Sequence, residues 1–157
     1  MGAAPSSSRG ARRGQQCIFC PGGVGAEPRS KRLHTDDLCY VVRDIAPACQ
    51  THLLIVPVRH VRDIDALEGE EDARLVEHME RVGRRLLEEH AAAHEHMVGF
   101  HRPPFNSVSH LHLHCFALPF TPFLKRLKYL PGISFKSPQW VAQRARERES
   151  HSIQTKP

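Results

Sequence analysis

The run of residues 109–116, SHLHLHCF, constrains the fold most, because histidines alternate in it with apolar residues. Successive side chains of a β-strand point to opposite faces of the sheet, so the run predicts a strand with an apolar core face and a histidine face. The histidine face consists of His110, His112 and His114. At about 3.3 Å per residue, the first and third histidines lie about 13 Å apart, a span comparable to the phosphate and sugar of a nucleotide.

The remaining patterns predict one long helix and three more strands around this run. Strands are expected at residues 38–42, 52–58 and 97–100, and the continuously apolar run 52–58 is typical of a central strand covered on both faces. Between residues 66 and 95 the apolar positions recur at steps of four, three and four, which indicates an amphipathic helix, and Gly83 permits close packing there. The order of these elements predicts an α+β domain with the helix packed on a mostly antiparallel sheet.

We expect three parts along the chain. Residues 1–16 contain small and polar residues with three arginines and no large apolar group, which predicts a disordered N-terminal tail. Residues 17–123 form the folded domain, and residues 124–157 form a basic C-terminal extension with a short helix at 140–148. The net charge of +5, from 22 Lys and Arg against 17 Asp and Glu, suits an anionic ligand but decides little by itself.

The cysteines and the absence of long apolar runs indicate where the protein works. The five cysteines are odd in number and lack the spacing of a disulfide framework, so free thiols in a reducing compartment are expected, and only Cys17 and Cys20 form a motif. No apolar run approaches the roughly 18 residues that cross a bilayer, and the N-terminus does not resemble a signal peptide. We therefore expect a cytoplasmic and nuclear protein without a membrane partner.

Three interpretations of the histidine face remain open from the residues alone. It can be a solvent-facing strand whose polar positions happen to be histidine. It can be a metal site, because histidines two apart on a strand can both ligate zinc. It can also be a catalytic site, in which a neutral imidazole attacks phosphorus while its neighbours donate hydrogen bonds to the developing charge. The spacing separates the last two interpretations only in part.

A family resemblance favours catalysis. The run His-Leu-His-Leu-His-Cys-Phe resembles the signature of the histidine triad superfamily, His-φ-His-φ-His-φ-φ, where φ is apolar. The runs 17–20 (CIFC), 44–60 and 106–108 (NSV) are similar to further segments of its nucleotide-binding branch, so the resemblance covers residues 17–118. It implies the fold of that superfamily and a hydrolase that cleaves purine nucleoside 5′-monophosphoramidates, adenosine preferred, and acyl-adenylates. A homodimer or a higher homo-oligomer is implied as well.

The resemblance also implies roles for individual residues. His112 is the nucleophile, which forms a nucleotidyl-histidine that water then hydrolyses, while His110, His114 and His52 complete the catalytic group. The implied substrate-binding residues, besides His112 and His114, are Asp44, Ile45, Asn106, Ser107 and Leu113. The chemistry requires no metal cofactor, since no phosphate-binding glycine loop or acidic cluster is present and charge neutralisation must come from histidines and backbone N–H groups.

A structural zinc is a separate expectation, and two departures qualify the resemblance. Cys17, Cys20, His60 and His110 match positions that bind zinc in some bacterial relatives, while two buried thiols without metal remain the alternative. The loop 101–105 (HRPPF) replaces a glycine-rich loop, and the run 119–122 (PFTP) replaces a tail that reaches a partner subunit's site in the close relatives. Base preference and dimer architecture can therefore differ here.

Two other functions remain as alternatives. One is a DNA-end deadenylase of the aprataxin type, which the run 99–101 (GFH) and a basic C-terminal region resemble. The basic residues concerned are Lys125, Arg126, Lys128, Arg144, Arg146 and Arg148. Because no DNA-docking module is evident, we do not expect a nucleic acid partner. The other alternative is a non-catalytic nucleotide sensor or scaffold, against which the intact middle histidine argues.

Overall fold

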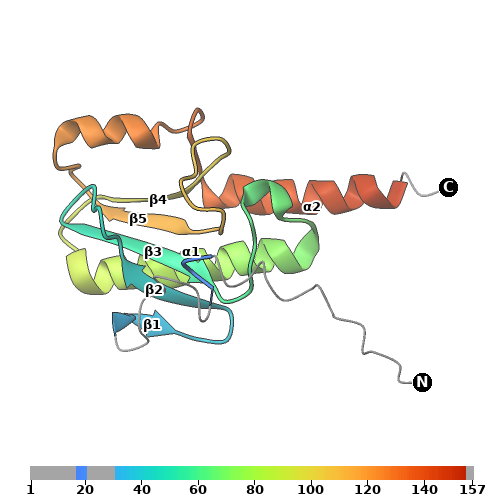
Figure 1. Ribbon diagram of the computed structural model, residues 1–157, viewed down its shortest axis with the longest axis horizontal. Helices are drawn as coiled ribbons and strands as arrows, with labels where there is room; N and C mark the ends of the chain where they lie inside the picture. The colour runs from blue at the N-terminus through green and yellow to red at the C-terminus, as the bar shows by residue number, and fades with distance from the viewer. Residues whose placement is uncertain (1–16, 21–30, 155–157) are drawn as a thin grey trace, which may run out of the picture.

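A computed structural model describes residues 17–20 and 31–154, and the expected tail at 1–16 lies outside these residues. Within them the strands form one antiparallel sheet in the order β1-β2-β3-β5-β4-β6 (Figure 1). The strands are β1 (His34–Thr35), β2 (Cys39–Arg43), β3 (Thr51–Pro57), β4 (His96–His101), β5 (Leu113–Ala117) and β6 (Phe135–Lys136). The helices are η3 (Ile64–Ala66), α1 (Gly69–Ala91), η4 (Phe123–Tyr129) and α2 (Pro138–Gln154). The predicted α+β class is confirmed.

The strand β3 lies inside the sheet, as its continuously apolar sequence predicts. It pairs with β2 on one side and with β5 on the other, and six of its seven residues are buried. Its register with β5 places Leu54 opposite His114 and His52 opposite Phe116. Because residues opposite each other in an antiparallel pair share a face, β3 and β5 together carry histidines on the same face of the sheet.

The strand that carries the histidine run is shorter than expected. We predicted a strand over 108–116, but β5 begins at Leu113, so His110 and His112 precede it. The chain there leaves the edge of β3 and binds the loop beyond it: the N–H of Leu111 donates to the carbonyl of Val61 over 2.7 Å. The predicted alternation of faces nevertheless holds, because Leu111 and Leu113 are buried in the apolar core.

The helix α1 covers one face of the sheet. It spans 69–91 rather than the predicted 66–95, because Ile64–Ala66 forms a separate 3-10 turn, capped by the carboxylate of Asp63, before it. Gly83 brings the helix close to β5, as the sequence suggested: a Cβ added there would lie 2.5 Å from the Sγ atom of Cys115. The core between helix and sheet therefore leaves no room for a larger residue at this position.

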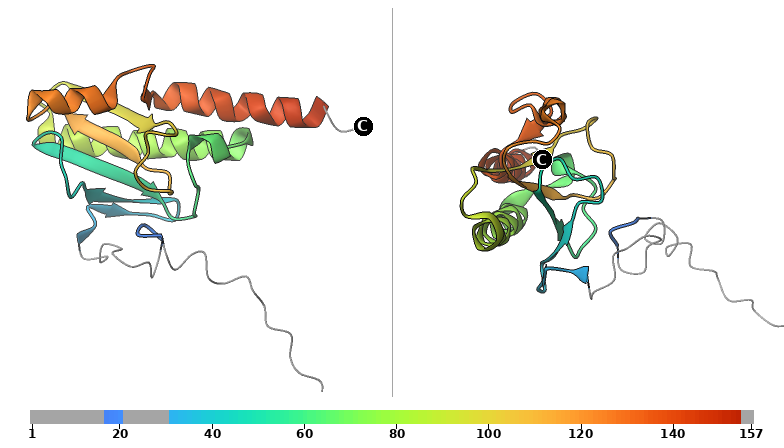
Figure 2. Two further views of the ribbon diagram at one scale, coloured as in Figure 1. Left: turned by 45° about the horizontal axis from the view of Figure 1, so that its top comes forward. Right: turned by 90° about the vertical axis from the view of Figure 1, so that its left-hand side faces the viewer.

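Residues beyond 123 pack onto the same domain. The strand β6 pairs with β4, with His101 opposite Phe135, and α2 runs antiparallel to α1 (Figures 1 and 2). Val141, Ala142 and Ala145 of α2 belong to the core that α1 forms with the sheet. The helix expected at 140–148 is thus part of a longer packed helix. The boundary at 123 stays a prediction, although residues on both sides of it pack together.

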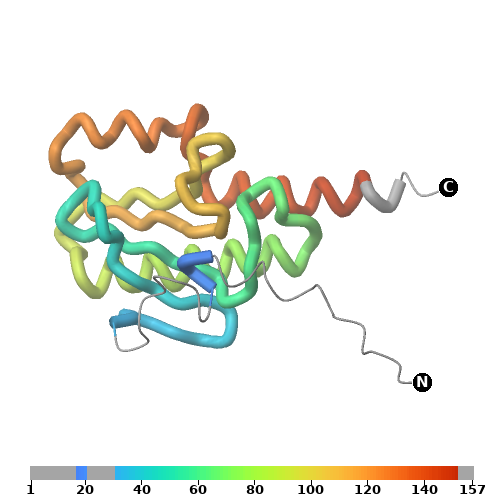
Figure 3. Tube along the Cα trace, in the orientation of Figure 1, coloured from blue at the N-terminus to red at the C-terminus, as the bar shows by residue number. Residues whose placement is uncertain are grey.

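The second face of the sheet carries the histidines and is covered differently. A second apolar cluster, Ala48, Cys49, Phe116, Tyr129 and Phe135, lies at one end of it. At the other end the short segment 17–20 lies beside the loop that follows β3 (Figure 3). No helix among the described residues is long and apolar enough to span a membrane.

Candidate active site

The histidine face opens into a pocket of about 360 Å³. Residues from six parts of the chain, far apart in sequence, line the pocket. They are Ile18 and Phe19 from the N-terminal segment; Tyr40, Val42, Arg43, Asp44, Ile45 and Ala46 from β2 and its turn; Leu54 of β3; His101 at the end of β4 and Phe105 in the loop after it; Ser107, Val108, His112 and His114; and Lys128 and Tyr129 of η4. A partly enclosed, partly apolar pocket with convergent polar groups is typical of a small-molecule site.

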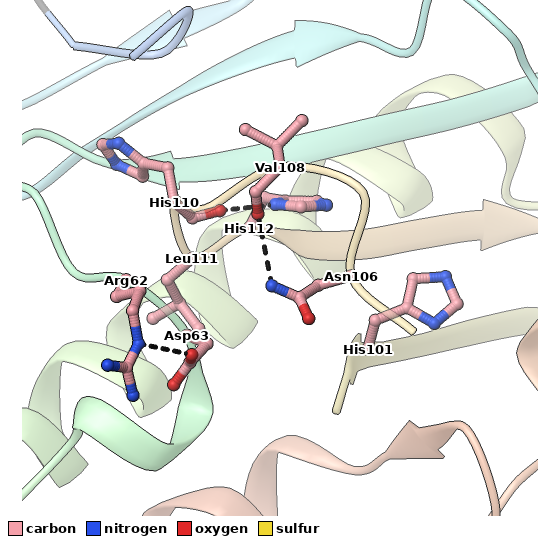
Figure 4. A pocket seen from close by; sticks show the side chains of 8 residues that line it. All are labelled: Arg62, Asp63, His101, Asn106, Val108, His110, Leu111 and His112. Carbon is pink, nitrogen blue, oxygen red and sulfur yellow. Dashed lines mark hydrogen bonds and ion pairs between the residues drawn. The ribbon is translucent and has the colours of Figure 1, made fainter. Parts of the chain in front are cut away.

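His112 has one ring nitrogen occupied and one available. Its Nδ1 lies 2.7 Å from the main-chain carbonyl oxygen of His110, as the close-up in Figure 4 shows. Because a carbonyl oxygen only accepts, Nδ1 carries the proton and donates, which leaves the lone pair on Nε2. The His112 side chain lines the pocket, and its residue is 7% exposed. A neutral imidazole with a free Nε2 lone pair is a nucleophile.

A hydrogen-bonded chain fixes the opposite tautomer in His114. The N–H of Ala48 donates to Nδ1 of His52 over 3.1 Å, so His52 carries its proton on Nε2. That Nε2 lies 2.9 Å from Nδ1 of His114 and donates to it, which places the His114 proton on its own Nε2. Within the described residues, Nε2 of His114 is buried without a hydrogen-bond partner. Since buried donors are normally paired, this N–H is suited to an absent ligand's oxygen.

The rings of His112 and His114 lie side by side, with centroids 4.9 Å apart. Burial lowers the pKa of both side chains, and it lowers the pKa of His52 to about 4 against a smaller opposing effect of the Asp44 carboxylate. All three imidazoles are therefore neutral near pH 7. One lone pair and one unpartnered N–H thus belong to two adjacent rings that line the same pocket, which is the arrangement that attack on phosphorus needs.

The predicted substrate ligands lie in three different places. Asp44, Ile45 and Ser107 line the pocket, and Ile45 is 90% exposed at its mouth. Asn106 lines a small adjoining cavity with His110 and His112, where its amide lies 3.5 Å from the carbonyl of Val108 (Figure 4). Leu113 is fully buried in the core, so its side chain does not reach the pocket and only its main chain can contact a ligand.

His110 faces away from this pocket and into a cluster with Cys17, Cys20 and His60. Its Nε2 lies 3.0 Å from the carbonyl oxygen of Pro57 and donates to it, so Nδ1 carries the lone pair. That Nδ1 lies 3.2 Å from the Sγ atom of Cys17, 3.6 Å from that of Cys20 and 3.2 Å from Nδ1 of His60. The side chain of His110 therefore belongs to this cluster, and its main-chain carbonyl is what orients His112.

Comparison with known proteins identifies the family. Residues 16–129 match the family model described as "Scavenger mRNA decapping enzyme C-term binding". The chain belongs to the histidine triad superfamily. The structure is similar to a histidine triad family hydrolase from Legionella pneumophila, with a TM-score of 0.56 and 26% identity over 64% of this chain and 90% of that one. The predicted superfamily fold is confirmed.

Two curated relatives confirm that the chain falls in the nucleotide-binding branch. It is 48% identical to "Bifunctional adenosine 5′-phosphosulfate phosphorylase/adenylylsulfatase HINT4" of Arabidopsis thaliana, over 73% of this chain and 79% of the relative. It is 34% identical to "Adenosine 5′-monophosphoramidase HINT3" of Mus musculus, over 82% of this chain and 79% of the relative.

The structure of this triad protein adds pocket residues that the sequence did not reveal. His101, Lys128 and Tyr129 are contributed by the end of β4 and by η4, and the ring of His101 lies 4.9 Å from those of both His114 and Tyr129. The sequence offered only a weak signal, since His101 shares the strand alternation of Met97 but begins the run 101–105, which differs from the glycine-rich loop of the family. Lys128 and Tyr129 lie in residues 124–157, for which the sequence predicts a C-terminal extension outside the folded domain.

Proposed function

We propose that this protein is a hydrolase of purine nucleoside 5′-monophosphoramidates and related acyl-adenylates, adenosine preferred, acting through a covalent nucleotidyl-histidine. The observation that carries the proposal is the pairing of a free Nε2 lone pair on His112 with an unpartnered N–H on His114 at one pocket. The activity named for the mouse relative supports it. The activity named for the Arabidopsis relative extends the candidate substrates to adenosine 5′-phosphosulfate.

In the first step Nε2 of His112 attacks the α-phosphorus, and the bond from phosphorus to the leaving nitrogen breaks. The amine departs with its electron pair and takes up a proton from solvent. The nucleotide remains bonded to Nε2 of His112, whose ring is then a cation because Nδ1 keeps its proton. The Nε2–H of His114 donates to a non-bridging oxygen, whose negative charge grows as phosphorus is attacked. Because His52 and Ala48 fix this proton in advance, the donor needs no rearrangement during the reaction.

In the second step water forms a bond to phosphorus and the bond to Nε2 of His112 breaks. The imidazole leaves as a neutral group, because its Nδ1 keeps the proton that it donates to the carbonyl oxygen of His110, and the proton of water passes to solvent. Dividing one difficult displacement into two makes each barrier lower. The nucleoside end occupies the opposite part of the pocket, where Asp44 can accept from ribose hydroxyls and the exposed Ile45 can lie against the base.

A structural zinc in the cluster of Cys17, Cys20, His60 and His110 is part of this proposal. Two thiolates and two imidazoles are a common structural zinc set, and tetrahedral coordination at usual bond lengths separates the ligands by about 3.3–3.8 Å. Four of the six separations between ligand atoms here are 3.2–3.6 Å, and all six are within 4.8 Å. The Pro57 carbonyl provides the outer hydrogen bond that zinc-binding histidines usually make. Bound zinc would tie the N-terminal segment to the domain; it enters no catalytic step.

The geometry does not favour the alternative of a DNA-end enzyme. Two arginines that suggested phosphate binding are engaged on the protein: Arg146 pairs with Glu70 and Glu77, and Arg148 pairs with Asp65. Their charge is therefore balanced by acidic residues beside α2. A purine nucleotide remains the proposed partner, and a homodimer and a cytoplasmic and nuclear location remain predictions.

The test compares His112→Asn with the parent and with His90→Asn, a change at an exposed histidine of α1. We expect the first variant to lose turnover of adenosine 5′-monophosphoramidate by at least about 1000-fold while AMP affinity stays within a few-fold. Rapid mixing and mass spectrometry should place the nucleotide on His112 in the parent. Equal turnover by the parent and the His112 variant would refute the mechanism.

A further inference from the structure

The pocket needs a positively charged side chain to bind a nucleotide, because its other groups are neutral or negative. Burial keeps the rings of His101 and His114 neutral, because it lowers the pKa of each. Asp44 adds a negative charge to the same pocket. A nucleoside monophosphate brings further negative charge, and like charges in a partly enclosed site repel each other strongly. The phosphate therefore needs a cation, and His112 and His114, whose pKa burial lowers, do not provide one.

Of the described residues that line the pocket, two are cationic, Arg43 and Lys128. Arg43 ends β2, one residue after Val42, which faces the pocket with Tyr40. Side chains alternate along a strand, so Arg43 shares the opposite face with Cys39 and Val41, which lie in the core under α1. Its main chain borders the pocket while its guanidinium is directed away. Lys128 is the remaining cation at the pocket.

Lys128 lies at the histidine end. It lines the same pocket as His101 and His114, and it directly precedes Tyr129, whose ring centroid lies 4.9 Å from that of His101 and 5.4 Å from that of His114. Among the residues that the structure describes, the Lys128 ammonium forms no ion pair and no hydrogen bond. By contrast Lys125, one turn earlier, donates to the carbonyl of Pro47. The ammonium of Lys128 is thus available to a ligand that the N–H of His114 also reaches.

Ser134 fixes the main chain that carries Lys128. Its hydroxyl donates to the Lys128 carbonyl over 2.9 Å and accepts from the N–H of Leu130 over 3.1 Å. The carbonyl of the same serine accepts from Nδ1 of His101 over 3.3 Å and from the N–H of Arg102 over 3.1 Å. Ser134 is 4% exposed. One buried residue therefore ties η4 to the end of β4, and Lys128 enters the pocket from a rigid support rather than from a loose extension.

We propose that Lys128 is a phosphate-binding residue of the active site, contributed by the segment after the triad, and that its ammonium pairs with the α-phosphate held by His114. The inference rests on the proposed function and deepens it, because it assigns the contact that compensates the phosphate charge. It makes η4 a working part of the catalytic domain.

The experiment measures the affinity of the full chain for AMP and for adenosine by calorimetry, in the parent, Lys128→Met, Lys128→Arg and Arg126→Met. Arg126 is the matched control, because it lies on the same helix, loses the same charge and packs over the Phe123 ring, 3.9 Å from its centroid. We expect Lys128→Met to weaken AMP binding about 10-fold and adenosine binding less than about 2-fold, as loss of one charge-assisted contact predicts. Lys128→Arg should recover part of the affinity, and Arg126→Met should bind both ligands as the parent does.

Other outcomes separate this inference from the proposed function. If Lys128→Met binds AMP as tightly as the parent, or loses AMP and adenosine equally, Lys128 does not bind the phosphate. If Arg126→Met loses as much AMP affinity as Lys128→Met, the effect is general electrostatics and the inference also fails. If the parent turns over adenosine 5′-monophosphoramidate and Lys128→Met binds AMP as the parent does, the inference fails but the proposed function is unaffected. A parent that neither binds AMP nor turns over the substrate overturns both.

Discussion

Replacing His52 with phenylalanine tests whether the relay from Ala48 to His114 sets the tautomer of the catalytic donor. His52 is 2% exposed and sits between the two, accepting from the N–H of Ala48 and donating to Nδ1 of His114. Phenylalanine keeps an aromatic ring against Phe116, whose centroid is 4.3 Å from that of His52, but it can neither accept nor donate. The variant therefore leaves a buried N–H and a buried ring nitrogen without partners.

The expected loss follows from those two unpaired atoms. Each buried polar group left without its partner costs about 1–3 kcal/mol, so the free energy of unfolding should fall by at least about 2 kcal/mol. In a domain of this size that corresponds to a Tm lower by about 4–8 °C. The His114 proton is then free to move to Nδ1, so kcat should fall about 10-fold, less than the roughly 100- to 1000-fold expected when a transition-state donor is removed outright.

The assay pairs thermal unfolding with steady-state turnover of adenosine 5′-monophosphoramidate. His52→Gln is the matched control, because an amide offers one donor and one acceptor and can serve both neighbours. We expect it to keep kcat within about 3-fold of the parent. Turnover by His52→Phe equal to that of His52→Gln would show that the relay does not set the donor, and the tautomer assignment of His114 would have to be abandoned.

Three further predictions concern stability. Burial lowers the pKa of His52 to about 4 in the folded protein, from about 6.5 in the unfolded chain. The stability that neutral His52 contributes is therefore fully present above about pH 6.5 and is lost as the pH falls toward 4. In denaturant titrations the free energy of unfolding should fall more steeply with acid in the parent than in His52→Gln. Removing zinc with a chelator should lower the Tm of the parent by about 5 °C or more and leave Cys20→Ser unchanged, with one zinc per parent chain by elemental analysis. Gly83→Ala should cost about 1–3 kcal/mol in spite of the better helix propensity of alanine, and adding Cys115→Ala should recover part of that loss in urea titrations.

The sequence predicted the elements whose side-chain period is strong. Three patterns each repeat within one segment of the chain: the apolar run at β3, the helical period of α1 and the alternation of histidines. Each could therefore be predicted from that segment alone. The start of β5 was wrong because strand length depends on the partner: the chain before Leu113 binds Val61 in the loop instead of β3. That contact joins residues 50 positions apart in sequence, and no local pattern encodes it.

The site was predictable where a motif names it and not where tertiary packing creates it. His112, His114, Asp44 and Ser107 were expected at the pocket and line it, whereas the side chain of His110 lies in the cluster with Cys17, Cys20 and His60. Lys128 and Tyr129 were not expected, because their segment is broken by prolines and lacks a clear period. Their place in the pocket depends on β6 pairing with β4, which the two-residue length of β6 hides from any sequence pattern.

The side chain and the main chain of His110 contact different groups. A substitution at this position therefore changes the cysteine–histidine cluster without removing the hydrogen bond that orients His112. Its ring contacts the sulfur atoms of Cys17 and Cys20. Its main-chain carbonyl oxygen, which every amino acid possesses, accepts the hydrogen bond that Nδ1 of His112 donates. A cysteine at position 110 would offer a sulfur in place of the imidazole nitrogen and keep that oxygen. Chains of this family could therefore exchange the first histidine for another zinc-binding side chain and still cleave nucleotides.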